Sequence, residues 1–218
     1  GLEQQFLLSV SHDLRTPLTS IQGYAEALAD GTAPDAAHAG TVILSESRRL
    51  TRLVRDLLEL ARLDSRSFTF DHVAIELHDL VEACAEGFAP EADAIGVRVV
   101  VDAAPAVVRG DPDRLAQVVA NLVENALKHA RSEVRVRVVV AEGRARVSVE
   151  DDGPGIAPID LPHVFERLYV ARREPLRQEN GSGLGLAIVR ELVVAMGGQV
   201  GAEPGATGAR LWVDLPTA

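Results

Sequence analysis

The sequence predicts an α+β protein in which an N-terminal helical hairpin precedes a domain of mixed helices and strands. Apolar residues recur at steps of three and four through residues 2–29 and again through residues 36–64, which is the spacing of one face of a helix. After residue 66, short runs with alternating apolar residues are interrupted by helical stretches, a pattern typical of strands mixed with helices. We therefore expect two domains, residues 1–66 and residues 67–218.

A turn cluster at residues 30–35 should reverse the chain between the two predicted helices. The apolar face of the first helix is expected to contain Leu7, Val10, Leu14, Pro17, Ile21, Tyr24 and Leu28. Two helices alone cannot cover such long apolar faces, and pairing with a second copy into a four-helix bundle would cover them. We therefore expect a homodimer; packing of the hairpin on the following domain is the alternative.

His12 falls between the apolar positions of the first helix, so its side chain should be exposed. Thr16 lies one turn further on the same face, and Asp13 flanks that face. Pro17 removes one backbone N–H and should bend the helix just after the histidine. His12 could be an ordinary surface residue, but a neighbouring carboxylate can hold the proton on one ring nitrogen and leave the other as a nucleophile.

The second domain should contain three helices and seven strands. Helices are expected at 76–90, 112–130 and 186–197, and strands at 68–72, 97–101, 107–108, 133–140, 144–152, 199–203 and 209–215. Only Glu142 and Gly143 separate two of these strands, so they should form an antiparallel hairpin. The alternation of side chains places Asp151 on the core face of its strand, where a carboxylate needs a partner.

Composition excludes some functions. A net charge of −10 and the lack of a basic stripe argue against nucleic-acid binding. The chain has neither a run of about 18 apolar residues nor a signal-peptide pattern, so we expect a soluble piece, and its initial Gly1 suggests a segment of a longer protein. The single cysteine, Cys84, fits the apolar pattern of its helix, so core packing is expected. The only tryptophan, Trp212, should face away from the apolar side of its strand.

Three groups of residues in the second domain suit a nucleotide. Asn121 and Asn125 lie four apart on one helix, and an amide oxygen is a suitable Mg²⁺ ligand, although both could be capping or surface residues. Asp151, followed by Gly153 and Gly155, offers an acceptor to the amine of adenine and room for a flat ring. The third group is the triplet Gly181, Gly183 and Gly185. This triplet would present backbone N–H groups to an anion, but plain loops also carry such triplets.

Taken together, five segments resemble the sequence boxes of sensor histidine kinases. Residues 11–18 (SHDLRTPL) resemble the H-box. In chain order, residues 121–129 (NLVENALKH) resemble the N-box and residues 151–156 (DDGPGI) the first-glycine box. Residues 164–167 (VFER) resemble the phenylalanine box, and residues 181–186 (GSGLGL) the second-glycine box. The resemblance covers nearly the whole chain. It implies that the second domain is an α/β sandwich with helices on one face of a mixed sheet, as in gyrase, Hsp90 and MutL-type ATPases.

The resemblance also implies an ATP site. Asn125 would be the Mg²⁺ ligand, Asn121 and Lys128 would lie near the phosphates, and Asp151 would bind adenine. The other ATP-binding residues that it implies are His129, Gly153, Gly155, Ile156, Phe165, Arg167, Gly181, Ser182, Gly183, Leu184, Gly185 and Leu186. The glycines would form a mobile lid anchored by Phe165.

Two positions depart from the commonest family pattern. His129 stands where tyrosine is usual and should alter stacking near the nucleotide. Asn180 stands where the lid often has another glycine, and it should stiffen the lid. Neither change removes an expected ligand.

As in the family, His12 would accept the γ-phosphoryl group of ATP, with Asp13 taking the proton from the other ring nitrogen. The phosphoryl group would pass to an aspartate of a response regulator, and Thr16 would serve in dephosphorylating that partner. The fragment would be cytoplasmic and the full-length protein a membrane sensor. The rivals are a non-catalytic dimerisation module and an ATP-driven conformational machine, whose acidic base is replaced here by Asn121.

Overall fold

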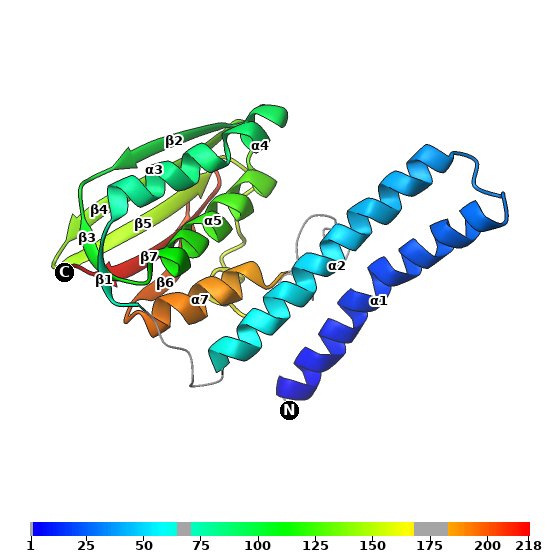
Figure 1. Ribbon diagram of the computed structural model, residues 1–218. Helices are drawn as coiled ribbons and strands as arrows, with labels where there is room; N and C mark the ends of the chain where they lie inside the picture. Colours follow the sequence, from blue (N-terminus) through cyan, green and yellow to red (C-terminus); the bar gives the residue numbers. More distant parts are fainter. Residues whose placement is uncertain (1, 65–70, 168–182) are drawn as a thin grey trace. The chain divides into compact units, whose positions relative to one another are not determined.

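The computed structural model describes residues 2–64, 71–167 and 183–218. Its contacts divide the chain into two compact units, one holding residues 1–61 with the described residues 167, 183 and 184, and the other holding residues 62–166 and 185–218. The first unit is the helical hairpin and the second carries the sheet (Figure 1). Both parts of the predicted α+β architecture are therefore present.

The hairpin consists of α1 (Leu2–Ala29) and α2 (Ala36–Asp64), with the ends that the periodicity predicts. The turn between them is built by two aspartates. Asp30 accepts a hydrogen bond from the Thr32 N–H at 2.9 Å, and Asp35 accepts from the first N–H groups of α2, which have no partner within the helix. α1 continues through Pro17 as one helix.

The buried face of α1 differs in part from the prediction. Val10, Asp13 and Pro17 are buried, whereas Leu14 is half-buried and Leu28 is 38% exposed. Val10 and Pro17 belong to the expected face, and Ile21 and Tyr24 are half-buried, so most of that face is confirmed. The difference is that Asp13 is more buried than its neighbour Leu14. Asp13, expected beside the exposed face, is therefore inside. Large apolar side chains remain exposed on both helices: Leu8, Leu18, Leu28, Leu44, Val54 and Leu58.

The second unit is a sheet with helices on one face (Figure 1). Its strands are β1 (Val73–Glu76), β2 (Arg98–Ala103), β3 (Val107–Gly110), β4 (Glu133–Ala141), β5 (Arg144–Asp151), β6 (Gln199–Pro204) and β7 (Ala209–Pro216). Its helices are α3 (Leu77–Gly87), α4 (Ala89–Ala94), α5 (Pro112–His129), the short 3₁₀ helix η1 (Leu161–His163) and α7 (Gly185–Ala195).

The main sheet has five strands in the order β2-β4-β5-β7-β6. β2 and β4 are parallel and the other pairs are antiparallel, which confirms the mixed sheet. β1 and β3 form a separate antiparallel pair. The hairpin of β4 and β5 turns at Glu142 and Gly143, both with positive φ, as predicted.

α5 supplies the centre of the core. Its N-cap is Asp111, whose side chain accepts a hydrogen bond from the Arg114 N–H at 3.2 Å, and Pro112 occupies the first turn. The buried side chains of α5 are Leu115, Val118, Val119, Leu122, Val123, Ala126 and Leu127. They face the apolar rows of the sheet, where Val134, Val136, Val147 and Val213 are fully or almost fully buried.

Two predicted elements need correction. The first strand begins at Val73; His72 precedes it, and Phe68 and Phe70 lie outside the described residues. The helix predicted at 76–90 is instead α3 and α4, separated at Phe88. Pro90 has no N–H to continue the hydrogen bonds of α3, so it begins a new helix in its first turn.

Cys84 is only half-buried, and its thiol contacts the Ala116 carbonyl at 3.7 Å across α3 and α5. Burial raises the pKa of this thiol, which favours the unreactive protonated form. Its packing role therefore holds, although the packing is looser than expected.

Trp212 lies on the face of the sheet opposite the helices, as predicted. The Arg146 guanidinium lies over its ring at 4.0 Å from the ring centroid. On neighbouring β6, Gly201 pairs with Trp212, and a Cβ at Gly201 would overlap the indole ring. The absence of a side chain at Gly201 therefore lets the indole lie across β6.

We predict that Gly201→Ala destabilises the second unit by about 1 to 3 kcal/mol, because the added methyl group and the indole cannot share the same space. Thermal unfolding and the emission of Trp212, the only tryptophan, measure the effect. Gly87→Ala is the matched control, since a Cβ there meets no atom within 4 Å. Equal melting temperatures for the two variants would contradict this account.

Candidate active site

Asp151 ends β5 with its side chain on the core face, 6% exposed. Its Oδ1 accepts a hydrogen bond from the Gly153 N–H at 2.8 Å. Burial raises the pKa of this carboxyl, and the N–H groups of Gly153 and Ala209 partly oppose that shift. The predicted orientation of Asp151 and its need for a partner are both confirmed.

Glycines hold three segments together around Asp151. A Cβ at Gly153 would overlap the carbonyl oxygen of His129, at the end of α5. A Cβ at Gly208 would overlap the carbonyl oxygen of Asp151, and Gly155 has a φ of 77°, which favours glycine. The end of β5, the end of α5 and the turn between β6 and β7 therefore meet at this carboxylate.

Asp152 fixes the loop that follows α5. Its carboxylate accepts hydrogen bonds from the Arg131 N–H at 2.7 Å, the Ser132 N–H at 3.1 Å, and the Ser132 hydroxyl. These bonds hold the pKa of the Asp152 carboxyl far below its usual range. Sequence reasoning missed this residue; the adjacent pair of aspartates at a strand end, one facing each way, is the signal that could have revealed it.

The polar face of α5 carries Asn121, Asn125 and Lys128. The Asn121 side-chain amide donates a hydrogen bond to the Gly185 carbonyl at 3.3 Å, so the predicted N and second-glycine segments do meet. Asn125 is half-buried one turn on. Lys128 forms an ion pair with Glu124 at 2.8 Å, which holds its ammonium group beside α5.

The remaining predicted site residues are placed as follows. Phe165 is buried, and Ile156 and Arg167 are half-buried. Gly183 has a φ of 68°, and Leu184 is fully buried just before α7. Leu186 is half-buried in the first turn of α7; Asn180, Gly181 and Ser182 lie outside the described residues.

The asparagine side chains suit Mg²⁺ better than they suit a metal ion that takes most of its ligands from the protein. Mg²⁺ keeps several waters and binds nucleotide phosphates with one or two protein oxygens. Within the described ranges, no group of three or more histidine, cysteine, aspartate or glutamate side chains could hold a metal ion. Asn125, half-buried on α5, offers one such oxygen.

In the hairpin unit, His12 is exposed as predicted, with 65% of its side chain accessible. Its Nδ1 lies 3.3 Å from Oδ1 of the buried Asp13. The Thr16 hydroxyl, on the next turn, donates to the His12 carbonyl at 3.3 Å. The imidazole is thus fixed at one nitrogen and open to solvent elsewhere.

Two family models match the chain. The His Kinase A (phospho-acceptor) domain covers residues 2–66, and the histidine kinase-, DNA gyrase B- and HSP90-like ATPase covers residues 110–218. The chain belongs to the histidine kinase family. It therefore carries the phospho-acceptor and ATPase-type parts of a protein-histidine kinase, the enzyme class that autophosphorylates in two-component signal transduction.

Individual proteins are also similar to the chain. The sensor protein SrrB of Staphylococcus aureus is 32% identical over 205 residues, which cover 91% of this chain and 35% of that protein, so the chain spans about a third of this relative. Full-length ShkA in complex with AMPPNP matches with a TM-score of 0.70 and 32% identity, over 99% of this chain and 46% of ShkA.

The histidine kinase AdeS of Acinetobacter baumannii shares the fold, with a TM-score of 0.78 at 24% identity over 94% of this chain and 97% of AdeS. In the described part of the chain, no helix is long and apolar enough to cross a membrane.

We predict that Asp152→Asn lowers the melting temperature at pH 7, because the charged acceptor of three hydrogen bonds is lost, each worth about 1 kcal/mol. The folded pKa of Asp152 lies below the unfolded value, so its contribution is complete above the unfolded pKa and is lost as the pH falls. The difference between wild type and variant should therefore shrink below about pH 4.

Thermal unfolding as a function of pH measures this difference. Asp93→Asn is the control, since Asp93 is exposed on α4 and should have little effect at any pH. A difference for Asp152→Asn that does not depend on pH would contradict a role for its charge.

Proposed function

We propose that His12 takes the γ-phosphoryl group of ATP and passes it to an aspartate of a response regulator. The exposed imidazole, held at Nδ1 by the buried Asp13 carboxylate, is the observation that carries the proposal. Burying the charge of a carboxylate costs free energy. A surface histidine with no chemical role would not need a neighbour that brings this cost.

The hydrogen bond to Asp13 places the proton on Nδ1 and leaves the lone pair of Nε2 free. Nε2 attacks the γ-phosphorus in line, a bond from nitrogen to phosphorus forms, and the bond to the bridging oxygen of ADP breaks. The ring gains positive charge as this happens, and the Asp13 carboxylate stabilises that charge and accepts the Nδ1 proton.

In the second unit, Asp151 accepts a hydrogen bond from the exocyclic amine of adenine. The placement of the Asp151 carboxyl on the core face at the end of β5, within the segment that resembles the first-glycine box, supports this role. Asn125 holds Mg²⁺, which neutralises the phosphate charge when it is bound. The AMPPNP bound to the relative ShkA supports ATP as the nucleotide.

The hairpin pairs with a second copy to form a four-helix bundle. Leu18, Leu44, Val54 and Leu58 are 45% to 56% exposed on a single chain, and a dimer would remove such side chains from water.

The receiver domain of the regulator docks at the exposed His12, and Thr16 serves the dephosphorylation of that partner. These two units act in the cytoplasm, attached to a membrane through a part of the full-length protein outside this chain, as the resemblance to sensor kinases suggests.

We expect wild-type protein incubated with γ-³²P-ATP and Mg²⁺ to become labelled with acid-labile, base-stable phosphate, and His12→Gln to remain unlabelled. The reason is that glutamine offers no ring nitrogen for attack. Removal of Mg²⁺ with a chelator should also abolish labelling.

His38→Gln is the matched control, because His38 is exposed in the same hairpin with its ring against Tyr24, and it should be labelled like wild type. Label that persists in His12→Gln would contradict the assignment. Wild-type protein that binds ATP without becoming labelled would favour a non-catalytic module, and release of phosphate without label would favour an ATP-driven machine.

We predict that Asp151→Asn weakens ATP binding by about ten-fold or more while leaving the fold at least as stable at pH 7. The asparagine oxygen can keep the Gly153 N–H, but its NH₂ group then faces the adenine amine, and two donors cannot bond. Burial raises the pKa of Asp151, so its ionised form destabilises the fold as the pH rises, and a neutral side chain removes that cost.

Calorimetric titration with ATP and thermal unfolding measure the two effects. Any gain in melting temperature should disappear below about pH 4, where the wild-type carboxyl is protonated as well. Unchanged ATP affinity would contradict the adenine role of Asp151.

A further inference from the structure

A groove of about 560 Å³ lies in the second unit between α3, α4 and β2. Its floor is apolar and includes Ala85, Ala92, Val97, Val99 and Val101. Three carboxylate side chains stand around it, those of Glu82, Glu86 and Asp93. We call this feature the β2 groove; none of the candidate active-site residues lines it.

The charge of the β2 groove is mostly uncompensated. Its one basic lining residue, Arg98, is bound to Glu133 at 2.6 Å. Glu82 faces the His78 ring at 3.4 Å, whereas Glu86 and Asp93 have no ion-pair partner within the described part of the chain. The groove thus presents negative charge beside an apolar floor, which suits a cation on an aliphatic stem.

The same groove borders an open sheet edge. β2 is the first strand of the sheet and pairs only with β4 among the described strands. The N–H of Arg98 donates to the carbonyl oxygen of Ser132, the residue before β4. Because alternate residues of a strand direct their backbone groups to opposite neighbours, those of Val99 and Val101 point to the free edge. These two valines also line the floor, so one partner strand could use both the edge and the groove.

We propose that the β2 groove docks an extended basic segment of a partner protein, which adds a strand to the free edge of β2 and places arginine or lysine beside Glu86 and Asp93. Main-chain hydrogen bonds to β2 supply binding that does not depend on sequence. Alternate side chains of the added strand point to the groove side, where their stems cover the valines and their charged ends reach the two carboxylates. The surface ion pairs give specificity more than affinity.

The probe is a fluorescein-labelled peptide of about ten residues in which arginine and valine alternate, long enough to match one strand. Anisotropy titration of the full 218-residue chain at physiological salt should give saturable binding. Glu86→Lys should weaken it by about ten-fold or more, because repulsion replaces attraction beside the bound strand.

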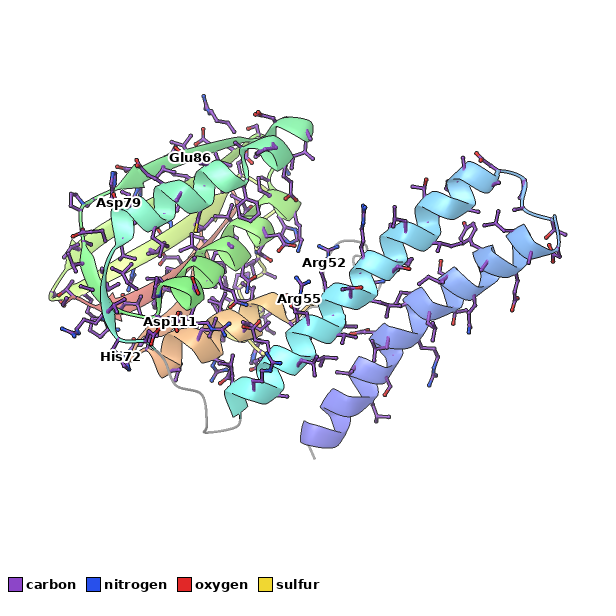
Figure 2. All side chains as sticks on the ribbon, in the orientation of Figure 1. Arg52, Arg55, His72, Asp79, Glu86 and Asp111 are labelled. Carbon is purple, nitrogen blue, oxygen red and sulfur yellow. The ribbon has the colours of Figure 1, made fainter. Side chains whose placement is uncertain are left out.

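Asp79→Lys is the matched control. Asp79 lies at the opposite end of α3 from Glu86 (Figure 2), outside the groove lining, and the charge change is the same. This variant should change the affinity by no more than about two-fold. An equal loss in both variants would show that the peptide only follows net charge, and would overturn the proposal.

Val99→Pro tests the edge itself. Proline removes the N–H that faces the free edge and leaves the hydrogen bonds to β4 intact, so peptide binding should fall by about ten-fold while the second unit still unfolds cooperatively on heating. Unchanged binding in Val99→Pro, or binding that persists in Glu86→Lys, would exclude strand addition at this groove. The groove shares no residue with the phosphorylation site, so both results are independent of labelling at His12.

Discussion

The buried carboxylate of Asp151 is the constraint on which the architecture of the second unit depends. A carboxyl group on the core face of a sheet is unfavourable unless donors surround it, and here backbone N–H groups supply them. Those donors can approach only because Gly153 and Gly208 leave no side chain in the way. The position of one side chain thereby fixes the path of two loops.

The neighbouring elements are fixed by similarly local interactions. Asp111 caps the start of α5, and Asp152 fastens the loop after its end, so the helix that presents Asn121 and Asn125 is held at both termini. The hydrogen bond from Asn121 to Gly185 joins α5 to the start of α7. A nucleotide bound against this frame would meet groups that need little rearrangement, which lowers the entropic cost of binding.

Much of this could be predicted from sequence because it depends on local rules. Periodicity located both hairpin helices and α5, and strand alternation placed Asp151 inside. The burial of Asp13 was not predicted because positions 13 and 14 both fit a three/four spacing, and periodicity alone does not decide which of the two side chains is more buried. The roles of Asp152 and Gly208 depend on contacts between segments distant in sequence, which no local pattern encodes.

The residues that break local preferences lie mostly at the candidate sites. Asp13 occupies a buried helix position and Asp151 a core strand position, where apolar residues would be more stable. Asp13 is next to His12 in the first unit, and Asp151 directly precedes the loop that contains Gly153 in the second. The chemistry proposed at both places depends on how these groups are positioned. Such exceptions lower the stability of the fold, and natural proteins keep them mainly where function requires them. Both aspartates lie inside the segments that resemble the family boxes, so these costly positions are also the positions that the proposed phosphoryl transfer uses.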